Sequence, residues 1–82
     1  MLNFYMEIKI GNMYFDTDSK QIDTVTDIVD NLVYYNIARL DGLDLGAKSS
    51  FMKSSYEHLI KNKVLIKIDK KDYVNFLYDS YV

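Results

Sequence analysis

Cysteine, proline and tryptophan are absent from this sequence of 82 residues, histidine occurs once and glycine three times. Without cysteine, neither a disulfide scaffold nor a zinc–cysteine site can form. No apolar run reaches the length of about 18 residues that a transmembrane helix needs. One His, two Glu and the lack of a glycine-rich phosphate loop leave few groups suited to catalysis. We therefore expect a protein that is not an enzyme and that has no metal site and no cofactor.

The remaining composition is typical of a small folded domain. Hydrophobic residues make up 49% of the chain, aromatic residues 15%, and the formal net charge is only −2. High apolar content with low net charge disfavours disorder, and residues 1–82 are expected to form one domain. The first ten residues carry Glu7 and Lys9 within an apolar run and do not resemble a signal peptide. We expect a cytoplasmic location without membrane contact.

Three segments have the pattern of strands. Apolar residues alternate with mostly polar ones from Leu2 to Ile10, which predicts a half-buried strand. Gly11-Asn12 has the composition of a hairpin turn, and residues 13–15 are predicted as its short return strand. Residues 64–68 are predicted to form a later strand.

Helical spacing predicts two helices, over about residues 20–39 and 49–61. For residues 70–82 two interpretations remain open. Asp69 and Asp72 resemble a helix capping box, whereas Tyr73, Val74 and Phe76 are residue types typical of strands. The predicted class is α+β, with a small antiparallel sheet packed on two helices in the order β-β-α-α-β and then α or β.

The predicted first helix carries a row of acidic residues. On a helix, Asp23, Asp27 and Asp30 would lie within about 60° of one another, and Tyr34 would continue the row. Residues 1–46 hold eight acids and three bases. Such a row is either a solvated face or a surface that competes for a basic groove on a larger protein. We take the second interpretation as the leading hypothesis, with these four residues as the partner-binding face.

The second half of the chain has the opposite charge balance, since residues 47–82 hold seven Lys and four acids. If residues 64–78 formed a hairpin, the order helix–linker–helix–hairpin would resemble a winged helix-turn-helix protein. The alternative hypothesis is therefore a DNA-binding regulator. Its nucleic-acid face would consist of Lys53, His58, Lys61, Lys67 and Lys70.

Residue usage over the whole chain points to an origin. Lys outnumbers Arg nine to one and Asp outnumbers Glu ten to two, as an A+T-rich genome encodes. In size and acidity the chain resembles small proteins of phages and mobile elements of low-G+C bacteria, such as anti-CRISPR inhibitors. That resemblance implies inhibition of a host machine that handles nucleic acid. Eight Tyr residues, a type enriched at interfaces, add a homodimer to the expected partners.

Overall fold

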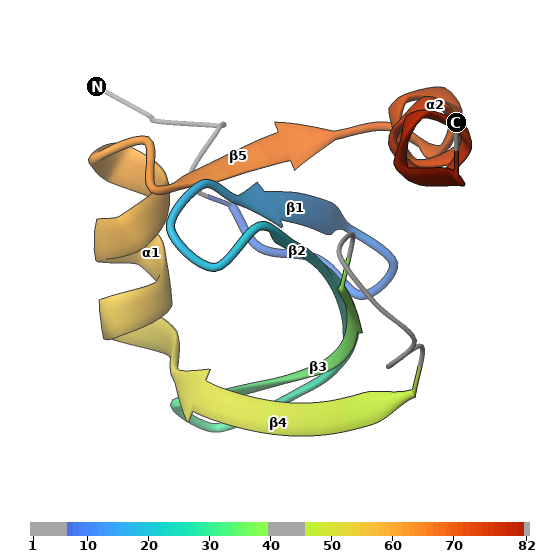
Figure 1. Ribbon diagram of the computed structural model, residues 1–82. Coiled ribbons are helices and arrows are strands. Elements are labelled where there is room, and N and C mark those ends of the chain that lie inside the picture. Colours follow the sequence, from blue (N-terminus) through green and yellow to red (C-terminus); the bar gives the residue numbers. More distant parts are fainter. Residues whose placement is uncertain (1–6, 40–45, 82) are drawn as a thin grey trace.

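The computed structural model describes residues 7–39 and 46–81, with side chains described as far as Asn75. Within these ranges the chain forms five strands and two helices (Figure 1). In chain order the elements are β1 (Met13–Asp16), β2 (Gln21–Val29), β3 (Leu32–Arg39), β4 (Ala47–Met52), α1 (Lys53–Lys61), β5 (Leu65–Ile68) and α2 (Lys70–Tyr81). The predicted α+β class with an antiparallel sheet is confirmed at this level, but the predicted order of elements is wrong.

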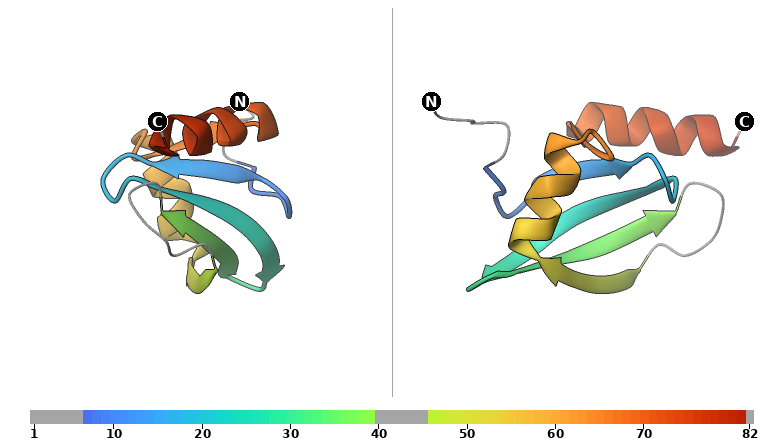
Figure 2. Two further views of the ribbon diagram at one scale, coloured as in Figure 1. Left: turned by 45° about the vertical axis from the view of Figure 1, so that its right-hand side comes forward. Right: turned by 90° about the vertical axis from the view of Figure 1, so that its left-hand side faces the viewer.

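All five strands belong to one antiparallel sheet, in the order β4-β3-β2-β1-β5. The sheet is strongly curved, so that its two edge strands turn toward the same side (Figure 1). Helix α1 contacts β3 and both edge strands, β4 and β5, and so bridges the open side of the curve. Helix α2 follows the end of β5 and lies on the opposite side of the molecule from α1 (Figure 1), and both views in Figure 2 show it along the β1–β5 side of the sheet.

The core lies between the inner face of the sheet and α1. Tyr56 and Ile60 of α1 point into it, and each lies at most 7% exposed. The sheet contributes buried side chains from four strands and the segment before β1 contributes one: Ile8, Tyr14, Val25, Val33 and Leu65. The ring of Tyr56 stands edge-on to that of Tyr14, with 5.5 Å between the ring centroids. These two tyrosines are the largest of the fully buried side chains among the residues described.

The predicted helix over 20–39 is wrong, because this segment is the β2–β3 hairpin. Six of the nine residues of β2 are β-branched, which favours a strand. The strand alternation is interrupted at Thr26, since the register shifts between Val25 and Asp27 as in a β-bulge. After this extra residue, Ile28 lies on the same face as Val25. Apolar residues three positions apart on one face are typical of a helix, but here the backbone is extended.

The predicted second helix is right only in its later part. Residues 47–52 form edge strand β4, and α1 starts at Lys53. Ser49 and Ser50, at the predicted start of this helix, therefore belong to β4. No side chain caps the start of α1, but the backbone N–H of Lys53 donates to the carbonyl of Asn31 in the β2–β3 turn at 2.8 Å. This tertiary hydrogen bond satisfies a backbone N–H at the helix start, as a capping side chain would.

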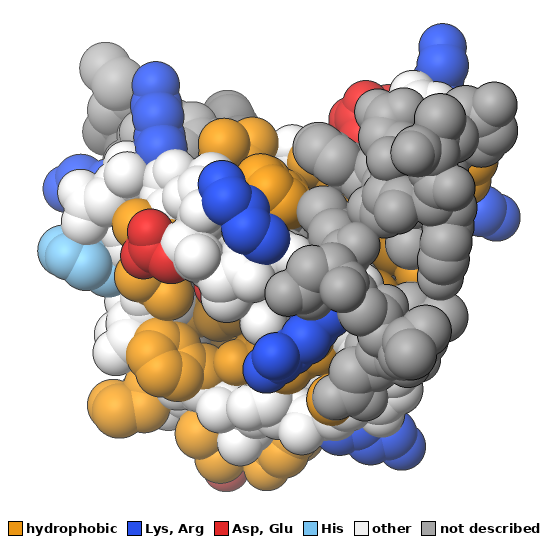
Figure 3. Space-filling model, in the orientation of Figure 1, with side chains coloured by type: hydrophobic (Ala, Val, Ile, Leu, Met, Phe, Trp, Pro, Cys, Tyr) orange, Lys and Arg blue, Asp and Glu red, His pale blue; other side chains and the backbone are white. Residues whose placement is uncertain are grey.

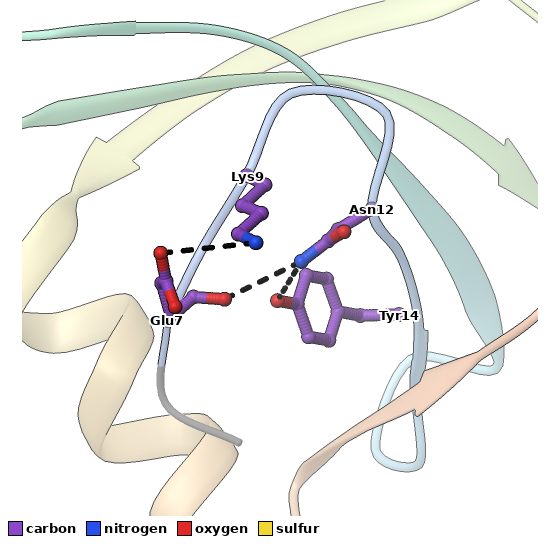
Figure 4. A network of polar contacts seen from close by, with 4 residues as sticks. All are labelled: Glu7, Lys9, Asn12 and Tyr14. Carbon is purple, nitrogen blue, oxygen red and sulfur yellow. Dashed lines mark hydrogen bonds and ion pairs between the residues drawn. The ribbon is translucent and has the colours of Figure 1, made fainter. Parts of the chain in front are cut away.

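The predicted N-terminal strand falls partly outside the described residues, which begin at Glu7. Residues 7–10 are not a strand, and β1 pairs with β2 and β5 instead. The predicted turn is present, with Gly11 at φ +94° and the N–H of Asn12 bonded to the carbonyl of Lys9. The Asn12 amide donates to the Glu7 carbonyl and to the Tyr14 hydroxyl, and Lys9 lies 3.9 Å from the Glu7 carboxylate (Figure 4). The two hydrogen bonds of Asn12 connect residues 7–10 to β1.

In the C-terminal part, the structure decides between the two interpretations that the sequence left open for residues 70–82. The strand predicted over 64–68 is confirmed as β5, and residues 70–81 are helical. The capping box is formed in both directions: the N–H of Asp72 donates to the Asp69 carboxylate, and the N–H of Asp69 donates to that of Asp72. Two otherwise unpaired donors at the helix start are satisfied in this way.

Helix α1 ends in a Schellman motif centred on Lys63. The N–H of Lys63 donates to the carbonyl of Ile60, and the N–H of Val64 donates to that of Leu59. Lys63 has φ +61°, the left-handed conformation in which glycine is the usual residue at this position. Because Lys63 has a Cβ atom, its backbone is strained in this conformation at the end of the helix.

Replacing Lys63 by glycine should stabilise the fold by about 0.5–1 kcal/mol, because glycine reaches this conformation without steric cost. Lys63→Ala is the matched control, since it removes the same charge but keeps a Cβ at positive φ. Urea unfolding followed by circular dichroism gives the free energies of unfolding. An equal effect of both variants would assign the change to charge instead of backbone conformation.

Candidate functional site

Three of the four residues of the predicted acidic face lie together, although not on a helix. Asp27 is exposed on β2 and stands opposite Tyr34 on β3, while Asp30 occupies the turn between these strands with φ +52°. The prediction that Asp23 shares this face is wrong, because only 2% of its surface is exposed and it lies on the inner side of the sheet. On a strand, residues four apart lie on the same face, but the bulge at Thr26 separates Asp23 from Asp27.

The outer side of the β2–β3–β4 end carries exposed apolar side chains in register. Val29 pairs with Leu32, which pairs in turn with Met52 on β4. The neighbouring row runs from Asp27 through Tyr34 to Ser50. We define the hairpin surface as Asp27, Val29, Asp30, Leu32, Tyr34 and Met52.

Four members of the hairpin surface are large apolar or aromatic side chains between 37 and 52% exposed. Hydrophobic side chains gather at this end of the sheet, below α1, in Figure 3. Single exposed apolar residues are ordinary, but a contiguous group with a polar rim marks an interaction site. Asp27 and Asp30 supply that rim.

The residues of the alternative nucleic-acid face are divided between two places. Lys53, His58 and Lys61 belong to α1, and the His58 ring lies 2.8 Å from the side-chain amide of Asn62. Lys67 and Lys70 line a pocket of about 430 Å³ where β5 meets α2. Lys and Arg side chains are dispersed around the face drawn in Figure 3.

The winged-helix arrangement is also wrong. It requires a hairpin over residues 64–78, but β5 is followed directly by α2. It further requires a helix before residue 40, where the chain forms β2 and β3. The wing and the first helix of the motif are therefore replaced by other elements.

A second region, which the sequence did not suggest, is a pocket of about 200 Å³ between the inner face of the sheet and α1. We call it the tyrosine pocket. Its lining consists of Asp16, Asp23, Tyr35, Phe51, Tyr56, Leu59 and Leu65. These residues come from all five strands and α1, so no local pattern could bring them together.

A hydrogen-bonded carboxylate forms the buried wall of the tyrosine pocket. The Tyr56 hydroxyl donates to Asp23 Oδ2 at 3.1 Å, and the Gln21 amide donates to Oδ1 at 2.9 Å. The pKa of Asp23 is raised to about 6, chiefly because burial disfavours the charged form. The two hydrogen bonds lower this pKa, and the nearby Asp16 carboxylate raises it. Burial, assisted by the negative charge of Asp23, also raises the pKa of Tyr56.

Asp16 is the second carboxylate of the tyrosine pocket and is half-buried. Its Oδ1 accepts the backbone N–H groups of Asp18 and Ser19 and so closes the β1–β2 turn. Among the residues described, the ion pair between Lys9 and Glu7 is the only one, so neither pocket carboxylate has a cationic partner there. Arg39, opposite Gln21 on β3, is exposed.

The described residues contain no group of three His, Asp or Glu side chains placed to hold a metal ion. Within ranges 7–39 and 46–81, no helix has the length and apolar character needed to span a bilayer. Searches for related proteins found no matching family model, no matching curated protein and no matching solved structure.

Proposed function

We propose that this protein is a non-catalytic binding protein whose hairpin surface covers a site on a larger protein. The observation that carries the proposal is the paired register of Val29, Leu32 and Met52, which exposes three apolar side chains side by side. Removing such area from water yields roughly 25 cal/mol per Å² before the costs of association. A folded partner that accepts these side chains would recover that free energy.

The acidic rim indicates which charge the binding surface of the partner should carry. Asp27 and Asp30 flank the apolar rows and form no ion pair among the described residues. A complementary surface would place Lys or Arg opposite them around an apolar depression. A host protein that binds nucleic acid offers such a basic surface, in agreement with the resemblance to small phage inhibitors. Long-range attraction between the charges would speed association and make its rate sensitive to salt.

The proposal is tested by tagged pull-down from a low-G+C bacterial lysate treated with nuclease, comparing the wild type with Leu32→Ser/Met52→Ser. Loss of both apolar side chains should weaken capture of a stoichiometric protein at least about tenfold, because central apolar contacts dominate interface free energy. Ile66→Ser is the matched control, since Ile66 is 46% exposed on β5 at the other edge of the sheet. Capture that is equal for all three proteins would overturn the proposal.

A further prediction concerns the rim. With the captured partner purified, Asp27→Asn/Asp30→Asn should slow association at low salt and flatten its salt dependence, with little change in the dissociation rate. Glu57→Gln is the control, because it removes a carboxylate from α1 and leaves the hairpin unchanged. Stopped-flow association rates at several salt concentrations measure the effect. Unchanged salt dependence in the double variant would exclude the proposed role of the two carboxylates.

A further inference from the structure

The tyrosine pocket combines two features that recognise organic cations. The half-buried ring of Tyr35 lines the pocket and lies next to the buried ring of Tyr56, with centroids 5.5 Å apart and ring planes 41° to each other. The ring of Phe51, which is 41% exposed, adds a third aromatic wall at the mouth. The faces of aromatic rings attract cations, and cages of several rings bind alkylated ammonium groups.

The charge in the pocket has the matching sign. Asp16 and Asp23 are both part of the lining, and neither has a cationic partner among the described residues. Asp23 is held at the inner end by Tyr56 and Gln21, whereas Asp16 is half-buried. The negative charge of Asp16 disfavours ionisation of Asp23, and a cation beside Asp16 would offset the repulsion between the two carboxylates.

From these features we infer that the tyrosine pocket binds an alkylammonium group, with the rings of Tyr35 and Phe51 around its carbon atoms and the half-buried Asp16 carboxylate nearest its charge. The volume of about 200 Å³ suits the end of one such side chain or a small free cation. The group has two sources, a free quaternary amine or a lysine side chain of another protein. This site is separate from the outer face of the hairpin surface, and its test does not depend on the proposed function.

The test is a titration of the full chain followed by ¹H–¹⁵N NMR, with choline as the probe and 3,3-dimethyl-1-butanol as its neutral isostere. We expect choline to shift the amide signals of the pocket residues with a dissociation constant in the millimolar range. The isostere should bind at least about threefold more weakly, because it lacks the charge. N-acetyl-lysine methylamide forms a second arm. Tighter binding than choline would assign the site to a lysine side chain, and weaker binding to a free quaternary amine.

Variants locate the binding. Asp16→Asn keeps an oxygen for the Asp18 and Ser19 amides but removes the charge, and should weaken choline binding at least about threefold. Phe51→Leu should do the same by removing the exposed ring. Asp27→Asn is the control, with the same change of net charge on the outer face. Equal binding of choline and its isostere, equal effects of Asp16→Asn and Asp27→Asn, or no shift of pocket signals would each overturn the inference. Dispersed spectra for every variant verify that it is folded.

Discussion

Replacing Asp23 by asparagine should make the protein more stable at neutral pH and remove a pH dependence of stability that we expect of the wild type. The pKa of Asp23 is raised from 3.8 to about 6 in the folded state, chiefly by burial. Between these values the unfolded chain has lost the proton while the folded chain still holds it. The free energy of unfolding therefore falls as pH rises from about 4 to about 6, and levels off above that range.

The size of this effect follows from the shift. Two pH units at 1.36 kcal/mol each make about 3 kcal/mol, a large fraction of the stability expected for a domain of this length. Asparagine keeps an oxygen that accepts the Tyr56 hydroxyl, and the Gln21 amide can turn its own oxygen toward the new NH₂ group. The variant should therefore retain both hydrogen bonds and avoid burying a charge.

Thermal unfolding at several pH values between 4 and 7.5 measures the difference between Asp23→Asn and the wild type. We expect that difference to grow with pH, to about 10 °C or more at pH 7. Asp27→Asn is the control, because Asp27 is exposed on the outer face. The comparison between the two variants isolates the contribution of Asp23. A difference that stays constant with pH would show that Asp23 ionises normally in the folded protein.

The second large effect is expected at Tyr56, whose ring lies between those of Tyr14 and Tyr35, with 5.5 Å between centroids in each pair. Tyr56→Ala removes a fully buried ring and should cost about 3–5 kcal/mol. A small domain has a total stability of similar size, so much of the variant should be unfolded at room temperature. His58→Ala, an exposed position on the same helix, should change stability by less than about 0.5 kcal/mol.

The hydroxyl of Tyr56 can be tested separately from its ring. Tyr56→Phe leaves Asp23 Oδ2 without this donor and should cost about 1–3 kcal/mol at neutral pH. The same change in an Asp23→Asn background should cost less, because no buried charge then loses its hydrogen bond. Urea unfolding of the four proteins gives the coupling free energy. Additive effects of the two substitutions would contradict a direct interaction in solution.

The candidate site was only partly foreseeable from the sequence. The density of acids drew attention to Asp27, Asp30 and Tyr34, and the structure places these three residues on one hairpin. The same pattern misplaced Asp23, because a spacing of four was interpreted as helical. The β-branched composition of residues 22–29, followed by Asp30-Asn31 as turn residues, is the signal that could have predicted the hairpin.

What the sequence by itself determined is the part whose contacts are local. The capping box of Asp69 and Asp72 and the short apolar strand before it act within a few residues, and both are present. The α+β class and a helix ending at residue 61 also follow from composition and spacing along the chain, although this helix starts at Lys53 and not at about residue 49.

Only the tertiary structure decided the rest. Strand β2 is extended because it pairs on both sides, with β1 and β3, and those hydrogen bonds outweigh a helical spacing of its apolar residues. Met13 lies beside Ile68, which is far along the chain, and the tyrosine pocket collects side chains from residue 16 to residue 65. Pairing over such separations depends on how the whole chain closes around its core, and a local window of sequence does not contain that information.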